Sequence, residues 1–172
     1  RSVGVEHILC VATDLDNAKQ VIEIAERYDD VSASVGVHPS DVADHQADID
    51  ELLRLAAHPK VIAIGETGLD YHYNDAGLDG MRQQFRDHIK VARELNKPLI
   101  IHSRDAREDT MRILDEEGAK SVAGVMHCFT ESWEMAQQAM ALGFYISISG
   151  IVTFKNAKEV AEVAKKVPLD RL

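Results

Sequence analysis

Three residues whose side chains can bind a metal ion stand at corresponding points of the chain, each after a short apolar run. They are Glu66, His102 and His127, and they are separated by 36 and 25 residues. Two neutral imidazoles and one carboxylate suit a divalent ion such as Zn²⁺ or Mn²⁺. A single histidine after a strand is more often a structural residue, but three equivalent positions together favour a metal site.

The apolar runs before these residues have the length and the β-branched composition of buried strands, and amphipathic stretches with helical periodicity lie between them. The six runs are His7–Ala12, Val31–Val37, Val61–Ile64, Pro98–Ile101, Val122–Met126 and Phe144–Ile148. Strands that are apolar on both faces belong in a parallel sheet covered by helices. The alternation therefore predicts a single α/β domain over residues 1–172.

Six strand–helix units in a row are compatible with an open doubly wound sheet or with a TIM-type (β/α)₈ barrel. Neither GxGxxG nor GxxxxGK followed by Ser or Thr comes after any of the runs, which excludes the commonest nucleotide-binding sites. In a barrel the carboxyl ends of all strands meet at one rim. A barrel would therefore direct Glu66, His102 and His127 to a shared centre, and His38 follows the second run in the same way.

The composition is that of an acidic globular protein of 172 residues, with 45% hydrophobic residues, 28% charged residues and a formal net charge of −10. These values exclude a disordered or fibrous chain, and they exclude the strongly basic surface from which nucleic-acid binding is usually inferred. An acidic protein that acts on a polyanion needs local positive charge, which a bound metal ion supplies.

The cysteines and the hydropathy pattern predict a cytoplasmic protein that does not cross a membrane. Cys10 and Cys128 lie far apart without CxxC spacing, which predicts buried, reduced thiols. The first residues lack the apolar core of a signal peptide. Residues 135–154 carry no charge, but their glutamines and glycines and a change of period predict a helix followed by a strand.

Four segments in chain order resemble the motifs of the TatD family of metal-dependent deoxyribonucleases: Gly36–Pro39, Gly65–Tyr71, Ile101–Asp105 and His127–Thr130. Residues 143–147 and 167–172 continue the resemblance. It implies a TIM-type barrel of the amidohydrolase-like superfamily with one or two divalent ions (Mg²⁺, Mn²⁺ or Zn²⁺). It also implies a monomer that hydrolyses DNA phosphodiesters, as a 3′-5′ exonuclease on single strands.

The sequence departs from this family at both ends. Family members begin with a strand that carries His-x-His, and their last strand ends in Glu-Thr-Asp, but neither motif occurs here. We therefore expect strands two to seven of an eight-stranded barrel, with the first and last strands missing. Because two histidine ligands and an aspartate are missing with them, we expect the 172 residues alone to be inactive.

The resemblance also implies roles for individual residues. Glu66 corresponds to a carboxylate that touches the metal ions and takes part in catalysis, and His102 and His127 correspond to ligands of the second ion. His38 corresponds to a catalytic residue close to the scissile phosphate. Arg104 could bind a phosphate oxygen through its planar guanidinium, and its alternative role is an ion pair at the start of the next helix.

Other side chains have weaker functional interpretations. Tyr71, with the adjacent His72, could stack on a nucleotide or hydrogen-bond to it, although an aromatic residue in a loop is more often a packing residue. His58 precedes a proline in a loop and His88 lies in a helical stretch, so we expect both to be exposed to solvent.

Two alternatives to a nuclease stay open. The same kind of metal centre can cleave carboxylic esters or amides, and the fold alone does not choose between these substrates. The second alternative is a truncated chain that folds or associates without turnover.

Overall fold

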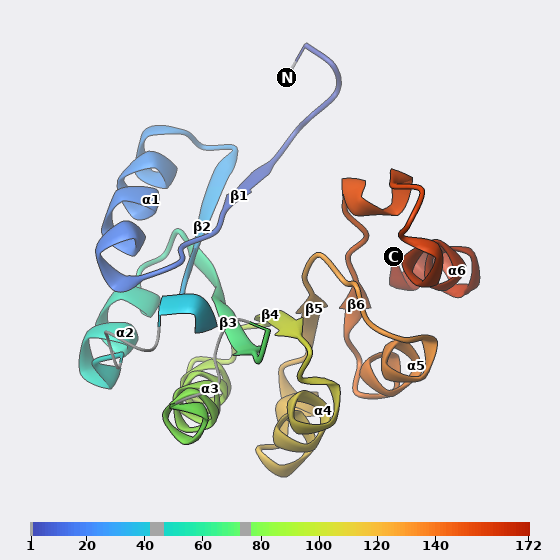
Figure 1. The fold of residues 1–172 in the computed structure, drawn as a ribbon. Coiled ribbons are helices and arrows are strands. Elements are labelled where there is room, and N and C mark those ends of the chain that lie inside the picture. The colour runs from blue at the N-terminus through green and yellow to red at the C-terminus, as the bar shows by residue number, and fades with distance from the viewer. Residues whose placement is uncertain (1, 42–46, 73–76) are drawn as a thin grey trace.

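The computed structural model describes residues 2–41, 47–72 and 77–172. Its centre is a six-stranded parallel sheet in which each strand pairs with the next in sequence. The strands are β1 (Ile8–Cys10), β2 (Val31–Val35), β3 (Val61–Asp70), β4 (Leu99–Arg104), β5 (Gly124–Met126) and β6 (Tyr145–Ile146). The sheet curls, and the helices lie along its outer side (Figure 1). A doubly wound sheet would reverse its strand order, so this order is that of a barrel-like fold.

The helices alternate with the strands, as the periodicity predicts. They are α1 (Leu15–Arg27), α2 (Ile49–Ala56), α3 (Leu78–Glu94), α4 (Arg107–Glu116), α5 (Trp133–Ala141) and α6 (Lys158–Lys166). Short 3₁₀ turns are η1 (Pro39–Asp41), η2 (Ala119–Ser121), η3 (Gly150–Thr153) and η4 (Leu169–Arg171). Within the described ranges, no helix has both the length and the apolar character needed to cross a lipid bilayer.

Helix α3 shows how the sequence specifies one of these elements. Met81, Phe85, Ile89 and Ala92 recur at helical spacing and are all buried against the sheet side of the molecule. A stripe of this kind stabilises a helix mainly by tertiary packing. The hydrophobic core lies between such stripes and the outer face of the sheet, and it extends from the first helix to the last.

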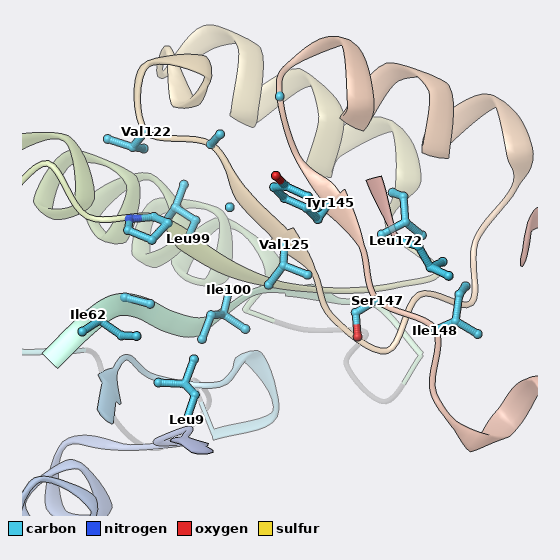
Figure 2. A pocket seen from close by; sticks show the side chains of 16 residues that line it. Leu9, Ile62, Leu99, Ile100, Val122, Val125, Tyr145, Ser147, Ile148 and Leu172 are labelled. Atoms are coloured by element: carbon cyan, nitrogen blue, oxygen red, sulfur yellow. The ribbon is translucent and has the colours of Figure 1, made fainter. Parts of the chain in front are cut away.

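The opposite, concave face of the sheet is also apolar. A cavity of about 680 Å³ lies there, and its lining includes Leu9, Ile62, Ile100, Val125 and Tyr145 (Figure 2). Leu9, Ile62 and Tyr145 are 36%, 44% and 48% exposed, whereas large apolar side chains in the strands of a parallel sheet are normally covered. The concave face therefore leaves apolar strand side chains open to solvent.

Two strands are longer than the apolar runs that predict them. β3 continues to Asp70 and β4 continues to Arg104, so Glu66 and His102 lie inside strands and not just after them. The register between β3 and β4 shifts between Ile64 and Thr67, next to Glu66. The polar ends of these strands still pair in the sheet, because backbone hydrogen bonding does not require apolar side chains.

Candidate metal centre

Close contact between β2 and β3 brings the segment that carries His38 next to Glu66. A Cβ atom at Gly36 would lie 2.6 Å from the Cα of Gly65, so only glycine permits this approach. The Ser34 hydroxyl donates a hydrogen bond of 2.7 Å to the Gly65 carbonyl and ties the two strands together at the same level.

Backbone hydrogen bonds hold the neighbouring functional residues in place. The His38 N–H donates to the Thr13 carbonyl at 2.7 Å, and the Glu66 N–H donates to the Ala12 carbonyl at 3.0 Å. The His127 N–H donates to the Ile101 carbonyl at 2.8 Å. Residues from three different strand–helix units are thus held in place by backbone hydrogen bonds.

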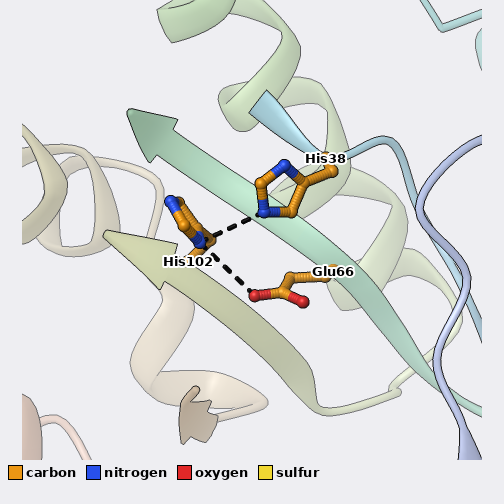
Figure 3. Close-up of side chains that lie close together, drawn as sticks. All are labelled: His38, Glu66 and His102. Carbon is orange, nitrogen blue, oxygen red and sulfur yellow. Dashed lines mark hydrogen bonds and ion pairs between the residues drawn. The ribbon is translucent and has the colours of Figure 1, made fainter. Parts of the chain in front are cut away.

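The side chains converge on one point at the carboxyl ends of the strands (Figure 3). His38 Nε2 lies 3.1 Å from His102 Nδ1, and His102 Nδ1 lies 3.5 Å from Glu66 Oε1. His127 Nδ1 lies 2.9 Å from the same Glu66 oxygen. The three residues named from sequence as metal ligands are therefore neighbours, and His38 lies beside them.

This donor set fits a divalent cation. One ligand atom from each of His38, Glu66 and His102 lies within 4.8 Å of the others. Two ligands at the usual metal distances in a tetrahedral site are about 3.3 Å apart, close to the separations seen here. Nitrogen from imidazole and oxygen from carboxylate are also the ligand types that borderline divalent ions prefer.

The electrostatics of the cluster favour a negative Glu66 carboxylate and positive charge on the histidines beside it. Burial opposes ionisation of Glu66, but hydrogen bonds with His102 and His127 outweigh it and lower the carboxyl pKa to about 2. Burial also opposes charge on His102, yet Glu66 and Asp70 raise its pKa overall, and Glu66 raises the pKa of His127. A metal ion would take the place of these protons, since imidazole ligates in its neutral form.

Asp70 belongs to this cluster, although the sequence analysis did not single it out. Its side chain is buried, and its Oδ2 accepts a hydrogen bond of 2.9 Å from His102 Nε2. With the proton on Nε2, the Nδ1 lone pair of His102 faces Glu66, which is the usual arrangement of a carboxylate that orients a metal-binding histidine. Asp70 stands four residues after Glu66 on β3, so strand alternation placed both on one face.

One histidine and the two cysteines differ in burial from what the sequence predicts. The expectation that His88 is exposed is wrong: it is fully buried under the sheet, where its ring is hydrogen-bonded on both sides. His58 is partly exposed and contacts Glu26 at 3.2 Å. Both cysteines are free thiols, but Cys128 is exposed and Cys10 is only half-buried.

The two predicted substrate contacts lie at the edge of the cluster. The Tyr71 hydroxyl donates to Asp109 Oδ2 at 2.6 Å and accepts from Arg82 Nε at 2.8 Å, which favours its packing interpretation. Arg104 ends β4 and pairs in register with Asp70, so it lies at the same end of the sheet as the metal centre. Their roles toward a substrate stay predictions.

Nearly the whole chain is similar in sequence to one family of known proteins. Residues 1–172 match the family model described as TatD related DNase. The uncharacterized metal-dependent hydrolase YabD of Bacillus subtilis is 48% identical over 169 residues, a match that covers 98% of this chain and 66% of YabD. The 3′-5′ ssDNA/RNA exonuclease TatD of Shigella flexneri is 35% identical over 171 residues, with 98% and 66% covered.

The fold has a close structural counterpart as well. The crystal structure of YJJV, a TatD homolog from Escherichia coli, superposes with a TM-score of 0.90 at 29% sequence identity. The superposition covers 98% of this chain and 66% of YJJV. The chain therefore spans about two-thirds of the length of the relatives that it matches.

Proposed function

The chain belongs to the TatD-related DNase family of metal-dependent hydrolases, and from this premise we propose that it cleaves phosphodiester bonds of single-stranded DNA in the 3′-to-5′ direction. The observation that carries the proposal is the convergence of His38, Glu66 and His102 at the carboxyl ends of the strands. The name of the Shigella flexneri relative, a 3′-5′ ssDNA/RNA exonuclease, supports the choice of substrate.

The proposed ligands of the divalent ion are Glu66, His102 and His127. The Nδ1 atoms of His127 and His102 lie 2.9 Å and 3.5 Å from the same oxygen, Glu66 Oε1. The chemistry that such an ion supplies when bound is a lowered pKa of water and polarisation of a phosphoryl oxygen. Glu66 adds negative charge that binds the cation, and Asp70 keeps the Nδ1 lone pair of His102 directed toward it.

His38 is better suited to the phosphate than to the cation. The backbone N–H of Ser40 points at His38 Nδ1 over 3.2 Å, so Nδ1 is an acceptor and the ring proton resides on Nε2. Nε2 faces the centre, 3.1 Å from His102 Nδ1. An N–H donor at this place can stabilise the charge that builds up on a phosphoryl oxygen. Arg104 is proposed as a further contact to the nucleotide, and the ring of Tyr71, whose hydroxyl is engaged by Asp109 and Arg82, is proposed as a stacking contact.

The test is hydrolysis by the full-length protein. End-labelled single-stranded oligonucleotides are incubated with Mg²⁺, Mn²⁺ or Zn²⁺, and products are resolved by length. Stepwise shortening from the 3′ end that stops on chelation is expected. Hydrolysis of a carboxylic ester or amide, with the oligonucleotides left intact, would overturn the nuclease assignment.

We also propose that the six strands correspond to strands two to seven of an eight-stranded barrel. Two observations support this: the apolar concave face, and the coverage of 66% of the relatives' length. Residues 1–172 alone should then self-associate through that face and lack nuclease activity, as size-exclusion chromatography and the oligonucleotide assay would show. An active, stable monomer of these residues would contradict the proposal.

Two properties of the whole protein follow as proposals from the same relationship. We propose a cytoplasmic location, which the free thiols of Cys10 and Cys128 support. We also propose a monomer, since a closed barrel leaves no strand edge to pair. Sedimentation of the full-length protein would test the second.

A further inference from the structure

Two buried polar side chains of α3 face the connection between β2 and α2, outside the metal centre. His88 is 0% exposed and Gln84 is 6% exposed, and they stand one helical turn apart. His88 Nε2 accepts a hydrogen bond of 3.0 Å from the Val37 N–H. Gln84 Oε1 accepts one of 3.0 Å from the Ala47 N–H.

The hydrogen bonds of His88 leave only one possible form of its ring. Val37 N–H can only donate, so Nε2 is the acceptor. Nδ1 lies 2.8 Å from the backbone carbonyl oxygen of Gln84, which can only accept, so Nδ1 carries the proton. Burial lowers the pKa of His88 to about 4, which keeps the ring neutral at neutral pH.

Val37 needs such an acceptor because it lies beyond the end of β2. The strand ends at Val35, and Val37 is 3% exposed, so its N–H has neither a strand partner nor water. A buried N–H without a partner is costly. The next N–H, that of His38, is held by the Thr13 carbonyl at 2.7 Å. Successive peptide groups are thus held from two sides of the molecule.

We propose that His88 is a positioning residue for His38: its Nε2 fixes the Val37 peptide and thereby sets where the His38 ring points. Gln84 supports it by holding Ala47, on the other side of the same connection. The proposal rests on the function proposed above, in which His38 donates to the phosphate. A shift of about 1 Å in such a group costs on the order of 100-fold in rate.

The variants that test this differ in which ring nitrogen they imitate. In His88→Gln the amide oxygen reaches the place of Nε2 and can accept from Val37, whereas in His88→Asn the amide reaches only the place of Nδ1. Ile89→Val is the matched control, since Ile89 is the fully buried neighbour of His88 on α3 and belongs to the hydrophobic core.

For the full-length protein we expect His88→Asn to lower kcat by 10- to 100-fold, with metal affinity within about twofold of the unmodified protein. His88→Gln should restore most of kcat, and Ile89→Val should leave it unchanged. Equal losses in His88→Asn and Ile89→Val would overturn the proposal, because general destabilisation would then explain both. Unchanged kcat in His88→Asn would overturn it as well.

A metal-free measurement separates this proposal from the nuclease assignment. In ¹⁵N-labelled protein, a coupling across the hydrogen bond should join Val37 N to His88 Nε2, and the His38 ring signals should shift in His88→Asn and return in His88→Gln. Absence of the coupling, or unshifted His38 signals, would overturn the positioning role even in an active nuclease. If His88→Asn does not fold, Gln84→Leu should shift the same His38 signals less, and unshifted signals there would overturn the proposal.

Discussion

Two polar clusters of this molecule are both built on aspartate and glutamate side chains, but the basic residues that face these carboxylates differ. The first is the metal centre, where Glu66 and Asp70 face imidazoles. The second, here called the α3–α4 ion-pair network, joins two outer helices through arginines. Its members are Asp79, Arg82, Arg86, Asp109, Arg112, Glu116 and Glu117.

The difference lies in whether the positive partner can give up its charge. Guanidinium stays protonated at every accessible pH, and together with the Tyr71 hydroxyl the arginines hold the pKa of Asp109 well below its usual range. Imidazole releases its proton near neutral pH and then offers a lone pair. The network therefore stabilises the α3–α4 contact permanently, whereas the carboxylates of the metal centre can exchange protons on their partners for a metal ion.

The largest expected effect tests that contrast directly. Glu66→Gln keeps the shape of the side chain and removes its charge, so binding of a divalent ion and hydrolysis by the full-length protein should fall by about 1,000-fold. Calorimetric titration with Mn²⁺ and the oligonucleotide assay measure the two losses. Glu116→Gln, the same change in the ion-pair network, should stay within about twofold in both. Full activity in Glu66→Gln would show that the Glu66 carboxylate is no more important for hydrolysis than a carboxylate of the ion-pair network.

The second effect concerns pH and the buried His88. Its folded pKa of about 4 lies below the usual value of 6.5, so the unfolded chain binds the extra proton between these pH values. Stability is therefore complete above about pH 6.5 and is lost as the pH falls toward 4, by on the order of 3 kcal/mol. Urea unfolding at pH 7 and pH 4.5 should show this loss in the unmodified protein. His88→Gln, which cannot titrate, should lose correspondingly less.

A smaller effect is expected at Asp70, because it acts through His102. Asp70→Asn weakens the hydrogen bond that keeps the His102 proton on Nε2. Metal affinity and activity should fall by about 10- to 100-fold, as for other outer carboxylates of metal sites. Asp79→Asn, at a fully exposed carboxylate of the ion-pair network, serves as the control. Wild-type metal affinity in Asp70→Asn would remove Asp70 from the metal centre.

The smallest effect belongs to the ion-pair network. Arg86 pairs with Glu116 at 2.5 Å and Glu117 at 2.7 Å, and its side chain is 23% exposed. Arg86→Gln should lower the free energy of unfolding by about 1 kcal/mol, less at high salt, without changing hydrolysis. Urea unfolding at two salt concentrations measures the first part. A loss of activity in this variant would show that the two clusters are coupled.

The sequence by itself determined the six strand–helix units and the meeting of Glu66, His102 and His127, because apolar periodicity sets the element type and a parallel barrel brings strand ends to one rim. The place of Asp70 on the face of Glu66 came only with the structure, in which β3 continues beyond the predicted run to Asp70. The hydrogen bond between Asp70 and His102 depends on the β3–β4 register, in which Gly68 pairs with His102.

His88 marks the limit of what the sequence determines. It stands seven residues after Met81, so helical periodicity was compatible with its burial. Histidine is only intermediate in its tendency to be buried, however, so the residue type did not indicate burial. Its burial depends on the Val37 N–H, which lies 51 residues earlier, beyond the end of β2. Only the tertiary structure could decide this pairing, because a buried donor is satisfied by whichever acceptor packs against it, and sequence distance carries no information about that contact.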